Sequence, residues 1–183
     1  MIGYYKEDPW SIIEEGFDPS MHEASESIFS LGNGRMGQRA NFEEQYSGDT
    51  LQGSYLAGIY YPDKTRVGWW KNGYPEYFAK VLNAPNWTGI DVEIGGEALD
   101  LHKIKPVEFR RELNMQQGYL ERTFAIYKEE QRLEIAVRRF LSMKRDEIAA
   151  IRYAIRSVDY SGPLSFTPYL DGNVVNQDSN YDE

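Results

Sequence analysis

The hydrophobic and polar positions of residues 90–168 alternate with a period of two. Ile90, Val92 and Ile94 alternate with Asp91 and Glu93, which predicts a strand with one buried face. Further alternating runs follow, and short turn-forming segments separate them. These segments lie at 95–96, 114–118, 128–131, 142–146 and 161–163. Short strands at this spacing, with no helical segment of convincing length, predict an antiparallel β-sandwich or barrel.

Two of these runs depart from simple alternation. Arg122 interrupts the apolar row that residues 120–126 are expected to present on one face. Residues 133–143 could be read as a helix, because their apolar positions also recur every four residues. Their β-branched content and their place between two turns favour a strand.

The first ninety residues are less regular. Residues 10–27 are predicted to be a loop with a turn of helix near 11–15, and residues 28–31 resemble a strand. Residues 61–89 contain Pro62, Pro75 and Pro85 together with three glycines. Such a segment predicts a long excursion from the sheet.

The segment Gly32–Gly37 matches G-x-G-x-x-G, the pattern of a dinucleotide-binding turn. That site requires a helix directly after the turn, within a βαβ unit, so that the helix amides hold the pyrophosphate. Residues 38–44 show no helical apolar stripe, and the rest of the chain reads as antiparallel sheet. We therefore predict a glycine-rich turn between strands.

Three polar motifs also favour structural readings. Glu43 and Glu44 are adjacent, and on a strand they would point to opposite faces, so they cannot flank one glycosidic bond. Asn86 begins a glycosylation sequon that is expected to stay unmodified without secretion. The Asp and Asn residues of 171–178 lack the spacing of a calcium loop and are better explained by turns.

The most distinctive segment is aromatic. Residues 68–78 hold five aromatic side chains on a stretch that also contains glycine and proline. Trp69, Trp70 and Tyr74 are the candidates for stacking on a sugar ring or for contacting a partner. Covering one end of the sheet is an equally good explanation.

Composition excludes several function classes. The 183 residues suit one domain or two small ones, and 41% hydrophobic residues exclude general disorder. A net charge of −9 argues against a nucleic-acid binder. No apolar run could cross a bilayer and no signal segment begins the sequence, so neither membrane insertion nor secretion is expected. Without cysteine, and with only His22 and His102, thiolate and histidine-rich metal sites are excluded.

The charge is unevenly distributed along the chain. Residues 1–102 carry 7 basic and 16 acidic residues, whereas residues 103–156 carry 13 basic and 8 acidic ones. The basic residues alternate with apolar ones, so solvation of one face of the sheet is the simplest explanation for them.

Three ordered segments resemble glycoside hydrolase family 65. They are Glu26–Glu44, with its Gly32–Gly37 turn, Gly53–Tyr60, and the closing Tyr169–Tyr181. The resemblance runs from about Trp10 to the last residue, and the Trp69–Phe78 segment and the Asn-rich end look most like the maltose phosphorylase branch. Kojibiose and trehalose phosphorylases are related branches.

The resemblance implies a fold and a place in a longer protein. It implies an N-terminal antiparallel β-sandwich of supersandwich type, with residues 1–183 forming a single domain or most of one. In the family a catalytic (α/α)6 barrel follows, and no stretch of this sequence corresponds to it. We therefore expect a fragment whose partners are its own downstream barrel and, in a homodimer, a second copy.

The resemblance also implies a function. The parent enzyme would be cytoplasmic and would cleave an α-linked glucose disaccharide such as maltose, with inversion, giving glucose 1-phosphate and glucose. Inorganic phosphate would be its co-substrate, and no cofactor or metal would be required. One glutamic acid of the barrel would protonate the leaving oxygen, so no residue here is expected to be catalytic. The alternative is a carbohydrate-binding module that acts alone, with Trp69, Trp70 and Tyr74 as its platform.

Overall fold

A computed structural model describes residues 4–65 and 75–176. The N-terminal elements are β1 (Tyr5–Glu7), β2 (Ser11–Glu15), a 3₁₀ helix (Pro19–Met21), α1 (His22–Ile28), β3 (Leu31–Gly32), β4 (Met36–Gln38) and β5 (Ser54–Leu56). The central elements are β6 (Tyr60–Lys64), β7 (Tyr77–Val81), β8 (Ile90–Ile94) and β9 (Glu97–Ala98). The C-terminal elements are β10 (Val107–Asn114), β11 (Tyr119–Lys128), β12 (Gln131–Leu141), β13 (Ala149–Ser157) and β14 (Leu164–Pro168).

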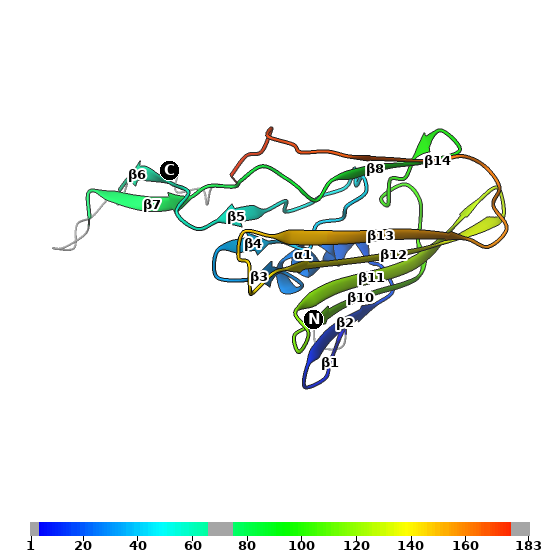
Figure 1. The fold of residues 1–183 in the computed structure, drawn as a ribbon, viewed down its shortest axis with the longest axis horizontal. Helices are drawn as coiled ribbons and strands as arrows, with labels where there is room; N and C mark the ends of the chain where they lie inside the picture. The colour runs from blue at the N-terminus through cyan, green and yellow to red at the C-terminus, as the bar shows by residue number, and fades with distance from the viewer. Residues whose placement is uncertain (1–3, 66–74, 177–183) are drawn as a thin grey trace.

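A six-stranded antiparallel sheet organises the molecule. Its strand order is β1-β2-β10-β11-β12-β13, and the last four strands form a meander. Smaller sheets of order β14-β8-β9, β3-β4-β5 and β6-β7 complete the described strands. Figure 1 shows β8 and β14 in a layer beside the large sheet, and the β6-β7 ribbon projecting from one end. The predicted, mainly antiparallel β fold is confirmed.

The main core lies between the large sheet and the β8 layer. Phe109, Phe124 and Ile135 reach it from β10, β11 and β12, and Val92 and Ile94 reach it from β8. The alternation that predicted these strands therefore marks the inward face. A second cluster lies under α1. It contains Phe29, Ala40, Leu113 and Leu120.

Two early predictions are wrong. Residues 11–15 form strand β2 instead of a helical turn, because they pair with β10, almost a hundred residues away. The helix lies instead at 22–28, where we predicted a loop followed by a strand. Its buried positions include His22, Ser25, Glu26 and, at the C-cap, Phe29. This is a helical spacing, but three of the four residues are polar, so hydrophobic periodicity cannot reveal it.

The predicted connections are in place. Gly95 and Gly96 both have positive φ and join β8 to β9. Glu129 and Glu130 join β11 to β12, also with positive φ (49° and 68°), a conformation that disfavours residues with a Cβ. The excursion predicted for residues 61–89 holds the β6-β7 ribbon.

Candidate functional site

A row of charged side chains crosses the inward face of the large sheet. In the strand register Glu14 is opposite Arg111, and Arg111 is opposite Arg122. The row continues through Val137 to Tyr153. Two arginines directly opposite each other repel, so this arrangement needs carboxylates between them.

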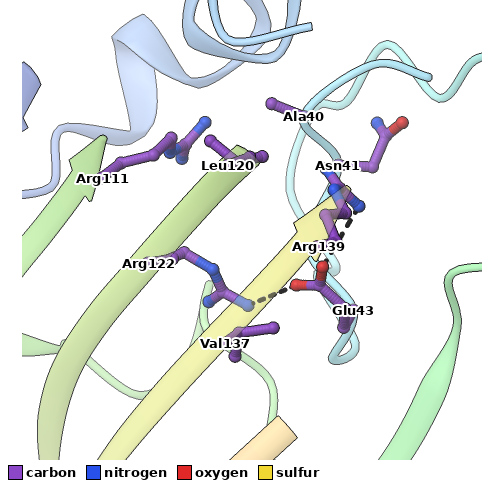
Figure 2. A pocket seen from close by; sticks show the side chains of 8 residues that line it. All are labelled: Ala40, Asn41, Glu43, Arg111, Leu120, Arg122, Val137 and Arg139. Atoms are coloured by element: carbon purple, nitrogen blue, oxygen red, sulfur yellow. Dashed lines mark hydrogen bonds and ion pairs between the residues drawn. The ribbon is translucent and has the colours of Figure 1, made fainter. Parts of the chain in front are cut away.

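The segment after β4 supplies those carboxylates. Arg122 Nη2 donates to Glu43 Oε2 at 2.8 Å and also to Glu44 Oε2. Arg139 Nη1 lies 3.2 Å from Glu43 Oε1, so Glu43 joins two strands (Figure 2). Tyr153 Oη donates to the other oxygen of Glu44 at 2.5 Å. All four charged side chains are at most 4% exposed.

This geometry corrects our argument about Glu43 and Glu44. They lie on a bend and not on a strand, so their carboxylates converge on one guanidinium instead of pointing to opposite faces. Both are enclosed and hold arginines, whereas a catalytic carboxylate must reach its substrate. The pair therefore attaches the 41–45 segment to the sheet.

Arg111 has a different environment. Its Nε lies 3.1 Å from Glu14 Oε2, and its Nη1 and Nη2 have no hydrogen-bond partner among the described residues. The guanidinium instead lies over Phe29, Phe42 and Phe109, 5.1–5.5 Å from each ring centroid. Aromatic faces attract a cation at such distances, so the rings stabilise this buried charge.

The electrostatics of the cluster follow from burial and pairing. Burial alone disfavours a charged guanidinium, but Glu44 and Glu43 outweigh it and raise the pKa of Arg122. For Arg139 burial prevails over the attraction of Glu43, and the pKa is lowered. Burial, reinforced by the negative Glu44, raises the pKa of Tyr153, so its hydroxyl keeps its proton and remains a donor.

Glu26 is another buried carboxylate that holds segments together, in this case α1 and the segment before β5. Burial opposes its charge, but the contact with His22 Nε2 at 3.1 Å and the bonds from Thr50 Oγ1 and Leu51 N outweigh this and lower its pKa. Asn41 Nδ2 also donates to Glu26, at 2.7 Å. One carboxylate thus joins α1 to two loop segments.

Asp100 fixes the far end of the 41–47 segment. Its Oδ1 accepts from Ser47 N and His102 N, and Lys103 Nζ lies 3.1 Å from Oδ2. Burial favours the neutral acid, but these donors, Ser47 first, lower the pKa to about 2.

The arginine cluster leaves little free space. Arg111, Arg122, Arg139, Asn41 and Glu43 border a cavity of about 10 Å³ (Figure 2). That is room for about one water molecule and not for a sugar or a phosphate ion. The cluster therefore attaches the 41–45 segment to the sheet and is not a substrate pocket.

The Gly32–Gly37 motif is a turn, as predicted, and no helix follows it. Asn33 Oδ1 accepts from Arg35 N and Met36 N. Asn33 Nδ2 donates to Ser142 O at 2.9 Å and to Asp146 O at 3.0 Å. The motif thus fastens the β3-β4 turn to the β12-β13 connection, and the alternative of a dinucleotide site has no structural support.

The closing polar segment also has a structural role. Asp171 Oδ1 accepts from Asn173 N, which forms the predicted turn. Asn86 and Asp171 exchange both backbone hydrogen bonds, and Asn176 bonds to Asn83 N and Val81 O. Residues 171–176 are thereby tied to the loop after β7.

The predicted contact residues Trp69, Trp70 and Tyr74 lie outside the described residues. The ribbon on either side of them is described, and it is unusually apolar for an exposed element. Tyr60, Tyr61, Tyr77 and Val81 are each more than half exposed. Exposed apolar patches of this kind mark interaction surfaces, so the β6-β7 ribbon is the candidate contact surface of this chain.

The described residues contain neither a candidate metal cluster nor a membrane-spanning helix. Within 4–65 and 75–176 no group of three or more His, Cys, Asp or Glu side chains is arranged to hold a metal ion. In the same ranges no helix has the length and apolarity needed to cross a membrane.

The sequence pattern points to only one of the three buried arginines. Arg122 visibly interrupts a predicted apolar row, whereas nothing in the predicted rows points to Arg111 or Arg139. Both stand at inward positions, Arg111 between Phe109 and Leu113, and Arg139 between Val137 and Leu141. A charged residue at a position where the alternation predicts a buried apolar one is the signal that identifies all three arginines.

Comparison with known proteins identifies the family and relatives of this chain. The sequence model described as "Glycosyl hydrolase family 65, N-terminal domain" matches residues 12–183. Maltose phosphorylase of Bacillus subtilis (strain 168) is 49% identical over 96% of this chain and 23% of its own length. Alpha,alpha-trehalose phosphorylase and kojibiose phosphorylase of Thermoanaerobacter brockii are each 32% identical, over 94% and 93% of this chain.

A solved structure agrees. The protein described as "Putative kojibiose phosphorylase from human microbiome" superposes with a TM-score of 0.84 at 33% identity, over 94% of this chain and 23% of that one. This chain spans about a quarter of the length of these relatives or less. Its match to the family sequence, supported by the shared fold, shows that the chain belongs to the N-terminal domain family of glycosyl hydrolase family 65.

Proposed function

We propose that this chain is the N-terminal accessory domain of a disaccharide phosphorylase that cleaves maltose with inorganic phosphate. The observation that carries this proposal is the 49% identity to a maltose phosphorylase, compared with 32% to trehalose and kojibiose phosphorylases. In this proposal the enzyme is cytoplasmic and uses phosphate as a co-substrate, without a cofactor.

In this proposal the chain contributes structure and contacts. The adjacent carboxylates Glu43 and Glu44 are enclosed by arginines and cannot act as an acid. The exposed β6-β7 ribbon is suited to packing against the catalytic part of the longer protein or against a second subunit. Mixing this chain with maltose and phosphate should therefore give no glucose 1-phosphate, and its appearance would overturn the proposal.

A second function is favoured by the same ribbon. Exposed tyrosines can stack on sugar rings, and the Trp69–Tyr74 segment adjoins them in sequence. A carbohydrate-binding module would bind maltose or maltooligosaccharides without any catalytic part. Calorimetry on this chain distinguishes the two, because the accessory domain should give no binding heat. Tyr61→Ala is the informative variant if binding is seen, with Tyr127→Ala, on an exposed tyrosine of β11, as the control.

A further inference from the structure

The buried arginine cluster carries more hydrogen-bond donors than its neighbours accept. Arg111 Nη1 and Nη2, Arg122 Nη1 and Arg139 Nε have no hydrogen-bond partner among the described residues. The three side chains are at most 3% exposed, and a buried N–H group without a partner costs free energy. All three arginines border the same cavity of about 10 Å³ (Figure 2). One acceptor in this cavity would therefore serve several donors.

The side-chain oxygens that border the cavity are already in use. Glu43 Oε1 lies 3.2 Å from Arg139 Nη1, and Glu43 Oε2 accepts from Arg122 Nη2 at 2.8 Å. Asn41 Oδ1 accepts from Gly53 N at 3.1 Å. A water molecule in the cavity would bring two hydrogens of its own, which also need acceptors. An anion only accepts, so it suits this set of donors better than water does.

The charge at the cavity favours an anion too. Three guanidiniums and one carboxylate, that of Glu43, border it, and three minus one leaves a local excess of two positive charges. Glu14 and Glu44 pair with Arg111 and Arg122 but do not border the cavity. Hydrogen bonds between a charged donor and a charged acceptor are the stronger class.

The size of the cavity limits which anion it can hold. It has room for about one body of the size of a water molecule, so phosphate, sulfate and carboxylate ligands are too large. We propose that the cavity binds a single chloride ion, held by N–H groups of Arg111, Arg122 and Arg139. The ion joins β10, β11 and β12 on their inward face, beside the 41–45 segment. This site is independent of the proposed function, because it needs neither a disaccharide nor phosphate.

Urea unfolding of this chain at constant ionic strength tests the site. Sodium chloride replaces sodium gluconate stepwise, because gluconate is too large for the cavity. A single ion that binds only the folded state lowers the unfolding equilibrium constant about tenfold for each tenfold rise in chloride concentration above its Kd. We expect that dependence, and an unfolding constant that does not respond to chloride overturns the proposal.

Two arginine-to-lysine variants locate the response. Arg111→Lys keeps a positive charge beside Glu14 but removes the two Nη donors that lack a partner. Arg138→Lys is the matched control, because Arg138 is a half-exposed residue of β12 that pairs with Glu121. The chloride dependence should be lost in Arg111→Lys and unchanged in Arg138→Lys. An equal dependence in both variants would place the ion elsewhere and overturn the proposal.

Bromide gives the position directly. Crystals of the unsubstituted chain grown in sodium bromide should show an anomalous difference peak in the cavity between Arg111, Arg122 and Arg139. This measurement decides the question even if Arg111→Lys does not fold, which far-UV circular dichroism reports. A cavity without anomalous signal, occupied by water alone, contradicts the proposal.

Discussion

Removing the guanidinium of Arg122 should destabilise the fold strongly. Arg122→Leu leaves Glu44, and partly Glu43, as buried carboxylates that have lost their shared partner. Breaking a buried ion pair by removing one partner costs about 3–5 kcal/mol. In a chain of this length, that corresponds to a fall in Tm of roughly 6–20 °C. Urea unfolding at pH 7 measures the free energy directly.

The pH dependence of this loss tests its cause. In the variant the buried carboxylates that Arg122 held lose their cation, and burial disfavours their charged form. Folding then takes up a proton, so the variant gains stability relative to the parent as the pH falls towards the unfolded pKa. The deficit should therefore shrink between pH 7 and pH 4.5.

Two further variants separate charge from packing. Arg138→Leu on β12 removes a half-exposed arginine paired with Glu121 and should cost less than about 1 kcal/mol. Arg122→Leu combined with Glu44→Gln should recover part of the loss, because the remaining Glu43 still has Arg139. A deficit for Arg122→Leu below 1 kcal/mol, or one that does not change with pH, would refute the reasoning.

Three further predictions concern single contacts. Asp100 has a folded pKa of about 2 against 3.8 for the free side chain, so its charge contributes about 2 kcal/mol above pH 4, and this contribution is lost progressively as the pH falls through 2. Unfolding of Asp100→Asn should show this deficit at pH 6 and about a third of it at pH 2.5, and an equal deficit at both would contradict the prediction. Replacing the strained turn by Glu129→Asn with Glu130→Gly should stabilise by about 1 kcal/mol in thermal unfolding, because those residues accept positive φ; a lower Tm would count against the strain. Asn33→Ala should cost about 2 kcal/mol through lost hydrogen bonds and speed hydrogen exchange at Arg35 and Met36, and unchanged protection there would argue against the clamp.

The sequence was most informative where one physical pattern dominated. From residue 90 onward, alternation located the strands of the meander, because each has one face in the core and neighbours that are close in sequence. The glycine and asparagine residues at 95–96 and 114–118 likewise predict the turns there. Family resemblance supplies the remaining step from a β fold to the N-terminal domain family of glycosyl hydrolase family 65.

Residues 11–28 were misjudged for a different reason. Strand β2 forms because it pairs with β10. The local sequence contains no signal of a pairing partner so distant. Helix α1 buries Glu26 beside His22, and this carboxylate is tolerated in the core because Asn41 donates a hydrogen bond to it. The convergence of Glu43 and Glu44 likewise depends on a bend whose cause is Arg122 on another strand.

The pairing of β2 with β10 also bears on how the chain folds during synthesis. The segments that carry Glu14, Glu43 and Glu44 are synthesised before the arginines that pair with them. Strand β2 pairs with β10, far along the chain, whereas β10 to β13 are sequence neighbours and close only short loops. We therefore expect the meander to form first and the N-terminal segments to dock on it afterwards. Ribosome-bound chains that end before residue 141 should accordingly leave α1 open to proteases.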